Sequence, residues 1–218
     1  MAHLDLEEQE QLDSLKHFWQ KYGGLITWAL IVLLAIYAGW NGWQYWQRKQ
    51  AVQATALYEE VERIAASGDA ARLDRALADM KDKFAGTAQA QQAALLAASV
   101  HASAGRSEAA RAALQWVTEQ GGDEGYQAVA RLRLAGLLLD AKSYDEALRQ
   151  LDATVPAEFA ALVADRRGDI YLAQGKKAEA GAQYQKAWAG LEEGNSYRQV
   201  VDIKLASLGL APAAGEKK

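Results

Sequence analysis

The sequence has no cysteine, two prolines and three histidines among its 218 residues. Without cysteine the chain has no disulfides, no thiolate catalysis and no cysteine-ligated zinc. This absence does not decide the compartment, because disulfides are optional even where they can form. Scarce proline, abundant alanine and the lack of any strand pattern together predict an all-α fold.

The chain also lacks a surplus of positive charge. It carries 28 Asp and Glu against 24 Lys and Arg, a formal net charge of −4. Proteins that bind nucleic acid need basic residues to neutralise phosphates, so we expect no nucleic-acid partner.

Catalytic signatures are missing as well. The sequence contains no HExxH, no phosphate-binding loop and no nucleophile elbow. We therefore predict a protein that is not an enzyme, with no catalytic residues, no metal and no cofactor. His101 falls in a predicted packing helix and is expected to be structural.

Charge is absent between Lys21 and Arg48. The 22 residues 25–46 would span roughly 33 Å as a helix, against roughly 30 Å for a bilayer core. A core helix of a soluble protein would show a polar face, but residues 25–38 offer only Thr27. A cleaved signal peptide would need a basic leader and a small residue before the cut, where this chain has an acidic leader and Ile36 or Tyr37. We predict one uncleaved transmembrane helix.

Aromatic residues gather at both ends of this segment. Their rings prefer the headgroup level, which predicts a membrane rim rather than a ligand-stacking site. The predicted rim residues are Trp19, Tyr22, Trp40, Trp43 and Trp46.

Two further features of the segment concern its neighbours and its direction. Gly39 and Gly42, each four residues after an alanine, are candidates for contact with a second membrane helix. Lys16 and Lys21 on one side balance Arg48 and Lys49 on the other, so counting positive charges leaves the orientation open.

Three stretches after this segment align with one another, beginning at Leu95, Leu132 and Arg166. Each has a small residue, a turn residue, an alanine and a bulky residue at fixed spacing. The four positions are Ala98, Gly105, Ala110 and Leu114, then Ala135, Lys142, Ala147 and Leu151, then Gly168, Gly175, Ala180 and Tyr184. A period near 34 residues with small residues at helix crossings is typical of tetratricopeptide repeats.

Flanking segments complete the predicted solenoid of helices. A degenerate repeat with a turn at Gly68 precedes the aligned stretches, and a capping helix that ends at Gly209 follows them. The sequence thus divides into a tail over 1–24, a membrane helix over 25–46, a repeat domain over 47–209 and a flexible tail over 210–218. Isolated repeats leave an apolar face bare, so the repeats must stack.

Tail, span and repeats together resemble the YfgM family, ancillary subunits of the bacterial Sec translocon. The resemblance rests on HFWQKYGG before the span, AGWNGWQYW at its exit and LVADRRGDIYLAQGKKAEA in the last repeat. It implies a single-pass inner-membrane protein with a cytoplasmic tail and a periplasmic repeat domain. It also implies three partners: the SecYEG translocon, exported polypeptides and a periplasmic chaperone of the PpiD type.

Two functional hypotheses follow, with an enzyme a distant third. In the first, the first helices of the repeats form a groove that holds a polypeptide. The predicted groove residues are Leu95, Ser99, Leu132, Leu139, Asp140, Asp165, Asp169 and Leu172. In the second, the repeats dock one folded partner and the membrane helix anchors it.

Overall fold

A computed structural model describes residues 6–211, with side chains from residue 15 onward. Nine α-helices and one 3-10 helix make up this part of the chain, which contains no strand. The elements are α1 (Leu6–Ser67), α2 (Ala70–Phe84), α3 (Ala88–Ser103), α4 (Ser107–Gln120), α5 (Glu124–Asp140), α6 (Tyr144–Leu151), η1 (Ala157–Phe159), α7 (Ala160–Ala173), α8 (Lys177–Gly190) and α9 (Tyr197–Ser207). The all-α prediction is confirmed; most of the tail predicted over 210–218 lies outside the described residues.

The described part of the chain forms two compact units, the first ending at Gln50 and the second beginning at Ala51. Helix α1 supplies the described part of the first unit and also enters the second, because it ends only at Ser67. No helix terminus coincides with the predicted end of the membrane segment at residue 46. The residues that follow, Gln47 to Ala51, are good helix formers that give the chain no reason to stop.

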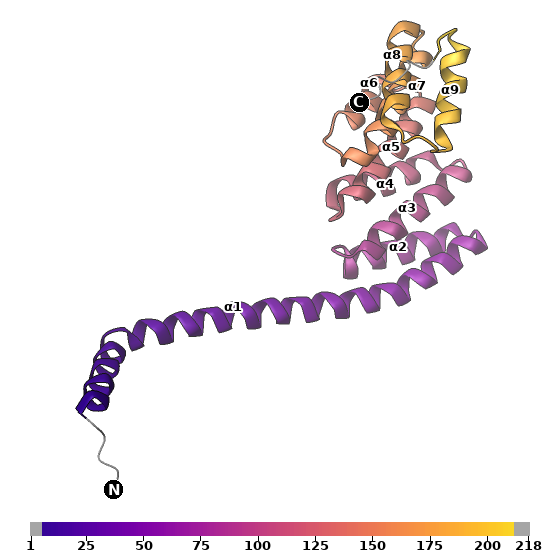
Figure 1. The fold of residues 1–218 in the computed structure, drawn as a ribbon. Coiled ribbons are helices and arrows are strands. Elements are labelled where there is room, and N and C mark those ends of the chain that lie inside the picture. Colours follow the sequence, from indigo (N-terminus) through magenta and orange to yellow (C-terminus); the bar gives the residue numbers. More distant parts are fainter. Residues whose placement is uncertain (1–5, 212–218) are drawn as a thin grey trace. The chain divides into compact units, whose positions relative to one another are not determined.

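In the second unit, successive helices from α2 to α9 contact one another in chain order (Figure 1). The predicted turns join α3 to α4, α5 to α6 and α7 to α8. They have positive φ: 71° at Gly105, 60° at Lys142 and 77° at Gly175. Gly68, the predicted turn of the degenerate repeat, has φ 74°, and Asp69 caps α2 by accepting from the Arg72 amide at 3.0 Å.

Small residues allow the two helices of each pair to cross closely. Ala98 and Ala110 are both buried, on α3 and α4. Gly168 of α7 faces the ring of Tyr184 on α8, where an added Cβ would lie 2.5 Å from Cδ1. The predicted packing role of these positions is therefore confirmed.

The buried side chains of this unit fall into two clusters. The larger runs from α1 to α7 and is built from Ala, Leu, Val, Ile and one Met. The smaller joins α7, α8 and α9 around Tyr184, Val201 and Leu205. Helix α9 thus closes the end of the repeat stack, as the predicted capping helix should.

Candidate functional site

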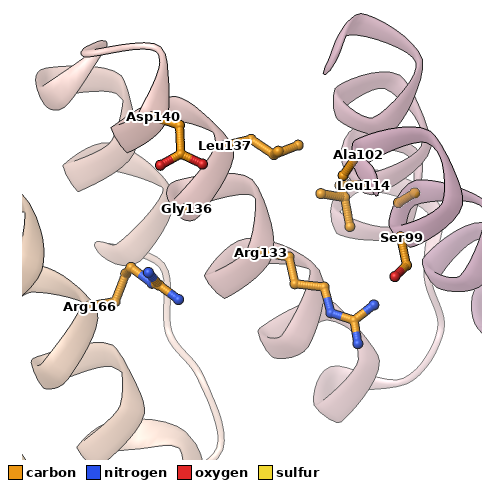
Figure 2. A pocket seen from close by; sticks show the side chains of 9 residues that line it. Ser99, Ala102, Leu114, Arg133, Gly136, Leu137, Asp140 and Arg166 are labelled. Carbon is orange, nitrogen blue, oxygen red and sulfur yellow. The ribbon is translucent and has the colours of Figure 1, made fainter. Parts of the chain in front are cut away.

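A pocket of about 300 Å³ opens between α3, α4, α5 and α7. Its apolar surface comes from alanines of α3 together with Leu114 and Leu137, and its polar groups are Ser99, Arg133, Asp140 and Arg166. Figure 2 shows Arg133, Leu137 and Asp140 along α5, with Arg166 on the neighbouring helix. The first helices of three successive repeats therefore meet at this pocket.

A second pocket of about 530 Å³ lies between α1, α3 and α5. It is lined by Tyr58, Gln92, Leu95, Leu96, Ser99 and Arg133. Ser99 and Arg133 line both pockets, so the two pockets adjoin one another at these side chains. We call this surface the repeat groove.

The repeat groove places two guanidinium groups along its length. Arg133 is exposed, and its Nη1 donates to the backbone carbonyl of Leu95 at 3.1 Å. Arg166 reaches over the backbone of α5, where a Cβ at Gly136 would lie 3.7 Å from its Cζ. Sequence reasoning missed both arginines, because Arg133 stands between leucines and Arg166 within the charged run DRR, and both look like ordinary surface positions.

Three of the eight predicted groove residues line the repeat groove: Leu95, Ser99 and Asp140. Leu132 and Leu139 are half-buried and pack against the larger core. Leu172 packs against the smaller core. These last three leucines belong mainly to the packing of the repeats.

Asp165 and Asp169 lie elsewhere, in an ionic cluster that joins α7 to α9. Lys204 donates to both oxygens of Asp165 at 2.8 and 2.7 Å and to Oδ1 of Asp169 at 2.7 Å. Tyr197 donates to Asp165 at 2.7 Å and Tyr184 to Asp169 at 2.9 Å. We call these five residues the α9 latch.

The charged groups of the latch are buried or half-buried. Asp165 is only 3% exposed, and the ring of Tyr184 lies 5.3 Å from the Lys204 ammonium. Burial, together with the Asp169 carboxylate, raises the pKa of Tyr184. Burial and the hydrogen bond to Asp165 raise the pKa of Tyr197. Both phenols therefore stay protonated and act as donors to the buried carboxylate of Asp165 and the half-buried carboxylate of Asp169.

The latch explains the VADRRGD segment in structural terms. Its two aspartates, one helical turn apart, both reach Lys204 on the capping helix, and the glycine before the second aspartate admits Tyr184. The partners of these carboxylates are side chains of the same chain, and the resulting hydrogen bonds and ion pairs attach α9 to α7.

His101 is a buried ionisable side chain of the central repeats. Its Nδ1 accepts from Nε of Arg106 at 2.9 Å, so Nε2 carries the proton toward Asp74, also at 2.9 Å. The histidine thereby ties α3 to α2 and to the following turn, in keeping with a structural role. No group of three or more His, Asp or Glu side chains able to hold a metal occurs among residues 15–211.

The first unit presents the predicted membrane segment. Among residues 15–211, α1 is the one helix long and apolar enough to cross a membrane. The five predicted rim residues are all exposed, as are the large apolar residues between Leu30 and Tyr37. Trp43 and Trp46 lie 5.4 Å apart between ring centroids on one face of the helix.

Gly39 and Gly42 leave open space beside the helix. A Cβ added at either position would meet no atom within 4 Å. The contact with a second helix predicted there stays a prediction.

Comparison with known proteins agrees with the predicted repeat fold and with the family resemblance. The tetratricopeptide repeat-like domain family matches residues 16–210. An ancillary SecYEG translocon subunit of Neisseria gonorrhoeae is 34% identical over 205 residues, which cover 93% of this chain and 98% of that protein. A protein of the same name from Escherichia coli is 28% identical over 173 residues, 78% of this chain and 82% of that protein. The chain therefore belongs to the YfgM family of ancillary SecYEG translocon subunits, with a tetratricopeptide repeat-like domain.

Proposed function

We propose that this chain is a non-enzymatic ancillary subunit of the Sec translocon. It crosses the inner membrane once through α1, with its N-terminus in the cytoplasm and its repeat domain in the periplasm. The repeat groove receives exported polypeptides beside SecYEG and passes them to a periplasmic chaperone of the PpiD type.

Three observations support this proposal. The two relatives carry the name of a translocon subunit. Helix α1 has the length and composition of a membrane span. The repeat groove carries the argument, because it is the extended, partly apolar surface that polypeptide binding requires.

The orientation is tested by protease added to spheroplasts that express the full chain. We expect digestion of residues 48–218 without membrane lysis, since the repeat domain faces outward. A cytoplasmic protein serves as the lysis control. Protection of the repeat domain until lysis would reverse the orientation and end the periplasmic proposal.

Polypeptide binding is tested by a photocrosslinking amino acid placed at Ser99 in the full chain. We expect adducts with many exported chains during secretion, together with SecYEG and chaperone adducts from the repeat domain. Glu119, exposed on α4 outside both groove pockets, is the matched control and should give few.

The pattern of adducts separates the two hypotheses. One discrete adduct at Ser99 would instead favour docking of a single folded partner. Absence of any translocon or chaperone adduct across the repeat domain would contradict both.

A further inference from the structure

The charges of the repeat groove are less balanced than those of the neighbouring pocket. The pocket between α1 and α2 is lined by Glu60 and Asp79 together with Arg72 and Arg75, two acids and two bases. The repeat groove has Arg133 and Arg166 against one acid, Asp140. Its positive charge therefore exceeds its negative charge.

Neither groove arginine is fully paired within the described structure. The hydrogen bond of Arg133 goes to a neutral carbonyl, and none of the ion pairs among residues 15–211 includes Arg133. Nη1 of Arg166 is 3.5 Å from Oδ2 of Asp169, a long contact to the oxygen that Lys204 and Tyr184 do not bind, and the buried Nε of Arg166 has no hydrogen-bond partner in the described part of the chain. Both guanidiniums thus retain donors for an external anion.

Apolar surface adjoins these donors on both sides. Leu95, Leu96 and Tyr58 line the groove before Arg133, while Leu114 and Leu137 line it beyond. A carboxylate placed between the arginines would have apolar groups within reach in either direction. Guanidinium groups bind carboxylates through paired hydrogen bonds, and partial exclusion of water strengthens such pairs.

We propose that the repeat groove selects polypeptide segments in which an acidic side chain lies next to apolar ones. This inference rests on the proposed function and names the chemistry of the chains the groove receives. Arg133 and Arg166 supply the preference for the acid, and the leucines on either side supply the apolar contact. Basic segments are disfavoured because the residues that line the groove carry more positive than negative charge.

The test uses the full chain in nanodiscs and fluorescein-labelled peptides of one apolar sequence with a central Asp-Glu, Asn-Gln or Lys-Lys pair. We expect the acidic peptide to bind about tenfold more tightly than the amide peptide, which is about the effect of one charge-assisted hydrogen bond. The basic peptide should bind most weakly. Added salt should reduce the difference, since exposed ion pairs are screened.

Arg133→Gln and Arg166→Gln should each reduce the preference, and the double variant should abolish it. Arg133→Lys keeps the charge and should keep most of the preference. Arg131→Gln is the matched control on the same helix, because Arg131 contacts the Thr118 carbonyl and lines neither groove pocket. Circular dichroism melts confirm that each variant is folded.

The two failures are distinguishable. Equal binding of the three peptides, or an unchanged preference in a folded double variant, would overturn the charge inference while Ser99 adducts still upheld the proposed function. No peptide binding and no Ser99 adducts would contradict both.

Discussion

The central repeats and the C-terminal end of the repeat domain are held together by different forces. The larger core, from α1 to α7, consists of apolar side chains dominated by alanine and leucine. The smaller core, between α7 and α9, has few buried apolar residues but adjoins the α9 latch. Truncation in an apolar core costs the lost burial and the cavity left behind, whereas removal of one partner from a buried ionic cluster leaves an uncompensated charge. The two ends of one stack should therefore respond differently to substitution.

The largest effect is expected from Lys204→Met. It removes the cation of Asp165 and leaves Asp169 with only the longer contact to Arg166 at 3.5 Å, which should cost about 3–5 kcal/mol of local unfolding free energy. Hydrogen exchange of the full chain should show α9 and α7 exchanging faster, with α3 and α4 unchanged. Adding Asp165→Asn should restore part of the loss. Lys83→Met, which removes an exposed pair with Asp79, should have little effect. Protection of α9 that survives Lys204→Met would mean that the latch does not hold it.

Leu134→Ala tests the opposite side of the comparison. Leu134 is fully buried on α5, so the cavity left by its truncation should lower the free energy of unfolding by about 2–5 kcal/mol. Exchange should accelerate in α3 to α6 and leave the latch in place. Ile203→Ala, at a position 70% exposed on α9, is the control. If α9 opened before the central helices, the division into two differently stabilised regions would be wrong.

Gly168→Ala should have a smaller effect at the boundary of the two regions. The added methyl group meets the Tyr184 ring. Displacing the ring should lower the free energy of unfolding by about 1–3 kcal/mol, even though alanine favours the helix. Thermal melting of the full chain measures the loss. Gly122→Ala, where a Cβ meets nothing, should be neutral. A neutral Gly168→Ala would show that the ring can shift freely.

The smallest effect concerns pH. The raised pKa values of Tyr184 and Tyr197 mean that the folded protein holds phenol protons which the unfolded chain releases above about pH 10. Their contribution to stability is therefore complete below that pH and is lost as pH rises. Hydrogen exchange in α9, corrected for its intrinsic pH dependence, should show protection falling more steeply above pH 10 in the natural chain than in a Tyr184→Phe/Tyr197→Phe variant. An equally steep fall of protection in the two proteins would show that the phenols of Tyr184 and Tyr197 do not stabilise the attachment of α9.

Much of the repeat fold was predictable because its rules are local. Ala98, Gly168 and the turn residues are fixed by helix crossing and by backbone geometry, which repeat along the chain. The latch was not predictable in this way. Lys204 lies 39 residues from Asp165 in a capping helix that belongs to no repeat, so no period connects the two. The aspartates were instead expected in the groove.

Within the groove, Leu95, Ser99 and Asp140 could be placed from the repeat register. Arg133 and Arg166 could not, because the hydrogen-bond donors that they leave free are known only from the positions of their neighbours in space. Spacing along the sequence shows which helix face a residue occupies. It does not show whether a carboxylate lies near enough to neutralise a charge.

The turn at Lys142 has a practical consequence. It has φ 60° at the position where the two other turns have glycine, and its side chain is exposed. The fold therefore accepts a side chain there, away from the core, the latch and the repeat groove. Because the natural chain has no cysteine, Lys142→Cys would introduce a single thiol. A dye attached to it would report on the repeat domain in a living membrane, with no other residue of the chain to compete for the label.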